Sequence, residues 1–188
     1  KALLLTQGMH GMVSQVEGLA KALKFNFKHQ KINLKPFWSL IPPKFTPIME
    51  NILTEKFVCD SKIIISCGRK SVIPSIALKK RLGNKIFNIH IQDPKVSYKH
   101  FDLIITPEHD GIKGDNILTT QGSIHYLTKK EITNNINYLQ LDAGKKKIVT
   151  FVIGGPNKYY DYSEDQTHFI FNKVKTLFTP DKFKIVII

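Results

Sequence analysis

The chain has 188 residues, of which 42% are hydrophobic, and this composition supports a packed globular core. The formal net charge is +13, but only two of the 28 basic residues are arginines and the lysines are scattered. Because arginine forks commonly read bases and phosphates, this pattern argues against nucleic-acid binding and favours weak attraction to an anionic membrane surface. No apolar run reaches the ~18 residues of a membrane-spanning helix. The two cysteines indicate neither a disulfide framework nor a zinc site, so we expect a reducing, cytoplasmic setting, with peripheral contact at the inner face of the membrane.

Most of the chain alternates short apolar strands with helices. The pattern predicts a strand over 2–5, a helix over 12–23, a strand over 25–34, an irregular proline-rich excursion over 36–47 and a short helix over 48–55. It continues with a strand over 63–66, a helix to residue 82 capped by Gly83 and Asn84, strands over 85–91, 102–106 and 117–120, and a helix over 129–139. Such alternation predicts an α/β fold, with a Rossmann-like parallel sheet covered on both faces.

A polar stretch with a glycine, residues 141–147, marks a domain boundary. We assign 1–143 to an N-terminal Rossmann-like domain and 144–188 to the start of a second one. The second part shows a strand over 148–153, a helix over 163–178 and a strand over 184–188, which predicts a βαβ unit. Because ~40 residues bury too little apolar surface to be stable alone, we expect the chain to be part of a longer protein.

Polar or glycine-rich clusters follow six predicted strands. They are residues 7–11, 67–71, 92–94, 108–110, 121–123 and 154–157. Ligands of parallel α/β sheets bind at the carboxyl ends of the strands, so the set predicts a binding site along that edge. The first and last clusters are glycine loops, which expose backbone N–H groups next to a positive helix end and suit a phosphate. Turns also need Gly, Pro and Asp, so each single cluster has a purely structural alternative.

Several short segments, taken together, carry a family resemblance. They are 8–11 with Gln15 and 18–20, 66–69, 91–94, 101–103, 107–110, Gly122 and 153–157. In these segments the chain resembles the bacterial relatives of the plant "elongated mitochondria" fission factor. That family is similar in fold to the GT-B glycosyltransferases, which have two Rossmann-like domains facing a cleft. The resemblance implies a nucleotide sugar as co-substrate with no other cofactor, and a second GT-B domain that is incomplete here.

The resemblance gives several of these residues candidate roles. His10 is a candidate general base for an acceptor hydroxyl, with a surface histidine of no catalytic role as the alternative. Gly154 and Gly155 allow close approach of a diphosphate, or form a tight turn. Gly68 and Arg69 are candidates to hold an acidic group of a ligand, with a structural salt bridge of Arg69 as the alternative.

The other strand-end residues complete the predicted site. We expect Gln92, Asp93, Glu108, His109 and Asp110 to form a polar wall of the cleft, although Asp93 before Pro94 also suits a simple turn. We expect no metal site, because three successive residues cannot point at one ion. The remaining ligand-binding candidates are Gly8, Gly11, Gln15, Gly122, Ser123 and Asn157.

The sequence leaves three functions open. The first is a glycosyltransferase-like enzyme that uses a nucleotide sugar, and the convergence of polar residues on strand ends favours it. The second is a non-catalytic scaffold on the same fold, since the plant members are implied to recruit a dynamin-type GTPase to the outer mitochondrial membrane. The third is a sensor that binds a nucleotide ligand without turnover. Fold alone does not decide among them.

Overall fold

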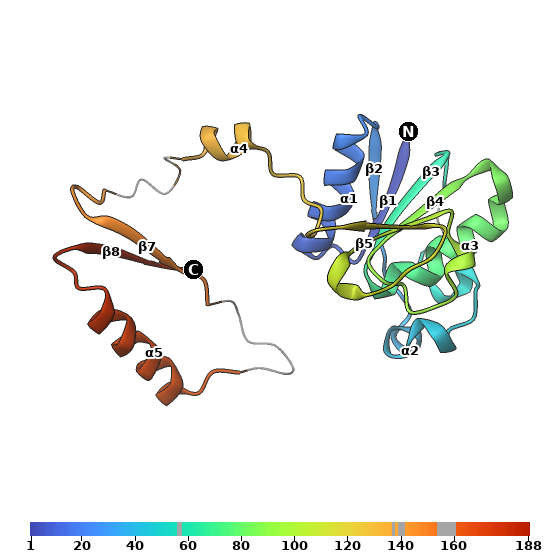
Figure 1. Cartoon of the computed structure of the whole chain (residues 1–188). Helices are drawn as coiled ribbons and strands as arrows, with labels where there is room; N and C mark the ends of the chain where they lie inside the picture. The colour runs from blue at the N-terminus through green and yellow to red at the C-terminus, as the bar shows by residue number, and fades with distance from the viewer. Residues whose placement is uncertain (56–57, 137, 139–141, 154–160) are drawn as a thin grey trace. The chain divides into compact units, whose positions relative to one another are not determined.

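The computed structural model describes residues 1–55, 58–136, 138, 142–153 and 161–188 (Figure 1). The chain forms two compact units, Lys1–Lys129 and Lys130–Ile188. The first unit holds a six-stranded sheet and the second a two-stranded sheet. None of the helices in the described part of the chain is long and apolar enough to cross a membrane.

Six parallel strands form the centre of the first unit. They are β1 Ala2–Thr6, β2 Phe27–Lys31, β3 Ile63–Cys67, β4 Phe87–Ile91, β5 Leu103–Pro107 and β6 Ile117–Thr120. The strands lie in the order β2-β1-β3-β4-β5-β6, and every neighbouring pair is parallel. The predicted α/β, Rossmann-like class is therefore confirmed.

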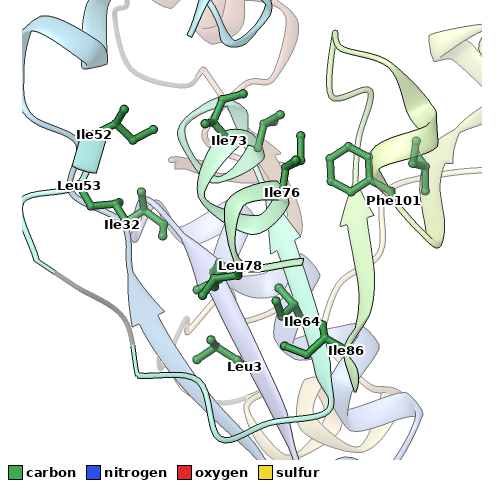
Figure 2. Packing of buried hydrophobic residues seen from close by; sticks show 13 residues of the cluster. Leu3, Ile32, Ile52, Leu53, Ile64, Ile73, Ile76, Leu78, Ile86 and Phe101 are labelled. Atoms are coloured by element: carbon green, nitrogen blue, oxygen red, sulfur yellow. The ribbon is translucent and has the colours of Figure 1, made fainter. Parts of the chain in front are cut away.

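Different helices cover the two faces of this sheet. Side chains of β1 alternate between the faces, so Leu3 and Leu5 pack with α3 (Val72–Leu82), whereas Leu4 packs with α1 (His10–Ala22). Figure 2 shows the side of the sheet that α3 covers, where the face of the helix that packs against the strands is apolar. Full burial of each such Leu or Ile side chain contributes about 1.5–3 kcal/mol.

Several predicted boundaries need correction. The first helix begins at His10 and not near residue 12, because Met9 is extended and Gly11 is compatible with helical geometry. The first-unit strand predicted over 25–34 is confined to β2, since the N–H of Phe25 bonds the carbonyl of Ala20 at the end of α1. The helix predicted to close this region, 129–139, is the shorter α4, Lys129–Asn134.

The excursion between β2 and β3 also differs from the expectation. It contains a short helix, α2 (Pro36–Leu40), which starts with a proline at a position where that residue is tolerated. The helix predicted over 48–55 is wrong: only a 3-10 turn forms, Glu50–Ile52, and Leu53 bridges Leu34 in an antiparallel contact. Burial of Ile52 and Leu53 against the α3 side of the core overrides the local pattern.

The second unit contains the predicted βαβ arrangement. β7 (Lys147–Phe151) and β8 (Phe183–Ile187) are parallel, and α5 (Glu164–Leu177) connects them along the chain. Ser163 caps α5: its side chain accepts a hydrogen bond from the N–H of Gln166, while Gln166 Oε1 accepts one from the N–H of Ser163. The Phe178 ring packs edge-on between those of Phe151 and Phe183.

Candidate functional site

The order of the strands reverses at β1 and β3. From β1 the chain turns outward to β2 on one side, and β3 then follows on the other side of β1. The loops that leave these two strands therefore run in opposite directions. Ligands of parallel α/β sheets bind at such a reversal of strand order.

Glycine with positive φ starts the turn at both strands. Gly8 has φ 85° and Gly68 has φ 89°, backbone conformations that residues with a side chain rarely adopt. The N–H of Gly8 donates to Thr6 Oγ1 at 3.0 Å, which fixes the first turn. A Cβ atom on Gly68 would lie 2.5 Å from Met12 Sδ and 3.2 Å from Gln7 Nε2. The loop after β3 thus packs closely against the residues that follow β1, and this close approach requires glycine at position 68.

The amino end of α1 opens at the same place. Met9 occupies the N-cap position without a capping side chain, and the first turn of the helix has no acidic residue. A Cβ atom on Gly11 would meet nothing within 4 Å, so this first turn is uncrowded. The positive end of the helix is therefore suited to an anionic group.

His10 is the first residue of α1 and does not lie in the preceding loop. Its Nε2 atom is 3.2 Å from the hydroxyl of Tyr126, which belongs to the segment that follows β6. The N–H of Tyr126 donates to Ser14 Oγ at 3.4 Å, one helical turn further along α1. Nothing near His10 in the sequence indicates Tyr126, so sequence analysis missed this partner.

Gly18 explains how this segment can run so close to α1. A Cβ atom there would lie 2.5 Å from the carbonyl carbon of His125 and 2.6 Å from its oxygen. Lys21 then follows on the same face of the helix, with Nζ 4.8 Å from the centre of the Tyr126 ring. The 125–126 segment thus lies along one face of α1 and orients His10.

Arg69 serves as a link between the β3 loop and α2. Its Nη2 atom donates to the backbone carbonyl of Ser39 at 2.6 Å. The predicted alternative for this arginine was a salt bridge, whereas its recorded partner is a neutral carbonyl. Trp38, next to that carbonyl, packs against the core.

The residues predicted to form a polar wall lie at the ends of β4 and β5. Asp93 Oδ2 forms an ion pair with Lys95 Nζ at 2.5 Å, and its Oδ1 accepts the N–H of Lys95 at 2.9 Å, so Asp93 also fixes a turn. Asp93, and to a smaller extent Asp110, raises the pKa of Lys95. Asp110 in turn accepts a hydrogen bond from the Thr106 hydroxyl at 2.5 Å. Lys95 is therefore paired with Asp93, while Asp110 is hydrogen-bonded to Thr106.

The other predicted site residues have more local environments. Gln92 sits at positive φ and donates its N–H to Ile105, which is unusual backbone for a side-chain-bearing residue. Glu108 and His109 are exposed in a 3-10 turn, and Ser123 is exposed after β6. Gln15 Oε1 lies 3.8 Å from Cys67 Sγ, and the Gly122 carbonyl accepts the Thr120 hydroxyl. Gly154, Gly155 and Asn157 lie outside the described residues.

A buried Ser66–His90 pair lies in the sheet and is structural. Ser66 Oγ is 2.8 Å from His90 Nδ1 and donates its proton to the Ile89 carbonyl at 3.1 Å. Nδ1 must then carry the proton that it donates to Ser66. Burial lowers the pKa of His90 to about 3, so the ring is neutral. Among the described residues, no group of three or more His, Cys, Asp or Glu is placed to hold a metal ion.

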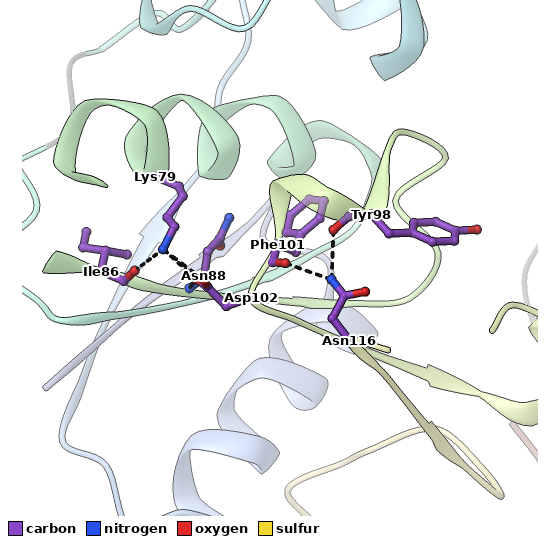
Figure 3. Close-up of polar contacts among 7 residues, drawn as sticks. All are labelled: Lys79, Ile86, Asn88, Tyr98, Phe101, Asp102 and Asn116. Atoms are coloured by element: carbon purple, nitrogen blue, oxygen red, sulfur yellow. Dashed lines mark hydrogen bonds and ion pairs between the residues drawn. The ribbon is translucent and has the colours of Figure 1, made fainter. Parts of the chain in front are cut away.

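Asp102, in one of the resemblance segments, holds the opposite edge of the sheet together (Figure 3). Its Oδ2 accepts the N–H of Asn88 at 2.6 Å and pairs with Lys79 Nζ at 2.9 Å. Lys79 also donates to the Ile86 carbonyl, so one carboxylate joins α3 to the starts of β4 and β5. This residue therefore has a structural role away from the carboxyl edge.

The sequence matches the model of a known protein family. The family model described as "Mitochondrial fission ELM1" matches residues 10–188, which is nearly the whole chain. The chain belongs to the ELM1 family. A stretch of 48 residues is 33% identical to the mitochondrial fission protein ELM1 of Arabidopsis thaliana and covers 26% of this chain and 11% of that protein. No solved structure matches the chain significantly. The predicted resemblance is thus confirmed at the level of the family.

Proposed function

We propose that this ELM1-family protein is a GT-B-like enzyme that transfers a sugar from a nucleotide sugar to an acceptor hydroxyl. The observation that carries the proposal is the reversal of strand order at β1 and β3, where Gly8, Gly68 and the amino end of α1 lie near His10. A site for an anionic ligand and a candidate base occupy one edge of the sheet.

In this proposal His10 is the general base. If its Nε2–H donates to the Tyr126 oxygen, Nδ1 is the unprotonated nitrogen and accepts the proton of the acceptor hydroxyl. The acceptor oxygen then forms a bond to the sugar carbon, and the nucleoside diphosphate leaves with the electron pair of the broken bond. The positive end of α1 stabilises its charge. Tyr126 acts through its contact with His10 and is a positioning residue.

The test measures release of nucleoside diphosphate by the full-length protein from a panel of UDP-, GDP- and ADP-sugars. Loss of a general base costs about 10²–10⁴-fold, so His10→Ala should lower release by at least about 10²-fold. Tyr126→Phe keeps the ring and should cause a smaller loss. His168→Ala, in exposed α5, is the matched control and should leave the rate unchanged. Turnover by the wild type that His10→Ala leaves unchanged would remove His10 from the mechanism.

The similarity to a protein described as a fission protein favours a second candidate, a non-catalytic adaptor on the same fold. An adaptor needs the surface of the fold but no proton transfer. It predicts no release from any nucleotide sugar by the wild type, together with normal folding. The panel therefore separates the two candidates.

A further inference from the structure

We propose that the α2 side of the first unit docks on the surface of an anionic phospholipid bilayer. The α2 surface consists of Phe37, Leu40 and Phe45 with the groove beside them, which is bounded by residues 43–48, α3 and residues 96–102. The proposal goes beyond glycosyl transfer, since docking needs neither His10 nor a nucleotide sugar.

Three large apolar side chains project from this surface. Phe37 is 65% exposed, Leu40 is 79% exposed and Phe45 is 71% exposed, all within nine residues of the chain. Trp38 packs edge-on against Phe37, with ring centres 4.9 Å apart, and is itself anchored on the core. Clustered apolar side chains on a rigid base commonly mark an interaction surface. In Figure 1 α2 protrudes from the edge of the sheet unit.

A groove with an apolar floor continues from these residues. Two adjoining hollows of about 270 and 180 Å³ share Ile48, Ile76 and His100 in their walls. Ile73 and Phe101 complete the apolar floor. This depression suits hydrocarbon, such as part of an acyl chain, better than a polar ligand.

The rim of the groove is positively charged. Lys44, Lys80 and Lys99 are exposed around it, and His100 lies in the wall of both hollows. Asp102 is the acidic residue among the described lining residues, and its charge is matched by Lys79 at 2.9 Å. The excursion itself, residues 32–49, contains no Asp or Glu. The field at this surface therefore favours an anion.

The combination selects a bilayer over other occupants. Free phosphate would need the lysines but not the projecting Phe37, Leu40 and Phe45. An apolar protein face would explain the projecting apolar side chains. It would not explain why the rim carries lysines whose charge no carboxylate of the lining balances. An anionic leaflet uses both, since apolar side chains enter the interface while lysines contact headgroup phosphates.

The test is sedimentation of the full chain with phosphatidylcholine vesicles, with and without phosphatidylglycerol. We expect binding only with phosphatidylglycerol. Replacing Phe37 and Leu40 together by serine, and separately reversing Lys80 and Lys99 to glutamate, should each lower the partition coefficient by at least about tenfold. These side chains are exposed, and thermal melting of each variant checks that the fold is intact.

The matched control reverses two other lysines, Lys24→Glu with Lys28→Glu. Lys24 follows α1 on the opposite face of the sheet, and Lys28 lies on the edge strand β2, away from β4. This variant has the same change in net charge and should bind almost like the wild type. An equal loss in the control, or no loss in the serine variant, would show attraction by overall charge and overturn the proposal. So would sedimentation velocity showing a dimer that the serine variant breaks, because the α2 surface would then contact a second copy.

Discussion

The hydroxyl of Tyr126 lies 3.2 Å from Nε2 of His10, although 116 positions separate the two residues in the chain. The contact exists because the chain returns from β6 at the far edge of the sheet to run along α1. Ser14, Gly18 and Lys21 each meet this returning segment on one face of the helix. The candidate base is thus positioned by a segment that ends the first unit.

The close passage at Gly18 gives the first prediction. In Gly18→Ala the new Cβ atom would lie 2.5 Å from backbone carbon of His125, and backbone cannot yield as a flexible side chain does. We expect a loss of about 1–3 kcal/mol in the free energy of unfolding, measured by urea denaturation. Gly11→Ala is the control in the same helix, where the Cβ meets nothing and alanine favours the helix. A stability of Gly18→Ala equal to that of Gly11→Ala would contradict the close passage.

A second prediction concerns the carboxylate of Asp102. Asp102→Ala removes the acceptor for the Asn88 N–H and the partner of Lys79, so the free energy of unfolding should fall by about 2 kcal/mol or more. Asp102→Asn keeps an oxygen for the Asn88 N–H and should lose less. Equal effects of the two substitutions in urea denaturation would show that the backbone hydrogen bond contributes nothing.

The buried ring of His90 makes stability depend on pH. Its pKa is about 3 in the folded chain because burial disfavours the charged ring, against 6.5 for an ordinary histidine. The pKa of His90 is lower in the folded chain than in the unfolded chain, so at acidic pH the unfolded chain binds a proton that the folded chain does not. With respect to this group the folded chain is therefore most stable above about pH 6.5, and it loses stability as the pH falls from 6.5 toward 3. The free energy of unfolding should decline by about 1.4 kcal/mol per pH unit below pH 6.

The variant His90→Leu isolates this contribution. It should be less stable at pH 7 but show a flatter decline between pH 6 and pH 4.5, as followed by urea denaturation. Some slope should remain from His29, whose pKa is also lowered by burial. An unchanged slope in His90→Leu would mean that His90 is not buried in its neutral form.

The two cysteines should differ in reactivity. Burial raises the pKa of the Cys67 thiol to about 12, whereas Cys59 is half-buried. Because the thiolate is the reactive form, iodoacetamide should modify Cys59 alone in the native chain and both cysteines in urea. Intact mass spectrometry reads the number of adducts. Native modification of Cys67 at the rate of Cys59 would contradict the packing of β3.

Local pattern was enough to predict most of the sheet. Residues 63–66 are a short, mostly apolar run, and residues 117–120 are two apolar residues followed by two threonines. Polar or glycine residues follow each segment, and both form strands of the expected parallel sheet. The helix predicted over 48–55 does not form. Its apolar residues are spaced like those of a helix, but Ile52 and Leu53 are held by long-range contact with the core. Periodicity reports which residues are buried, but not the partner that buries them.

Only part of the candidate site at the carboxyl ends of the strands could be predicted from the sequence. Gly8 and Gly68 were found because positive φ selects glycine, a signal that stands in the sequence itself. Tyr126 and Lys95 were missed because an ordinary tyrosine or lysine carries no such signal. Their roles depend on strand order, which a single sequence does not specify.

The most direct test of the proposed site is amide NMR of the ¹⁵N-labelled chain during titration with a UDP-sugar, a GDP-sugar and an ADP-sugar in turn. We expect at least one of them to shift the amide signals of Gly8, His10, Gly11 and Gly68, where β1, β3 and α1 meet. The His10→Ala variant should still bind, since the backbone N–H groups remain. If every nucleotide sugar leaves these four signals in place, or shifts only signals of residues 144–147 and 181–183, the proposed site is contradicted.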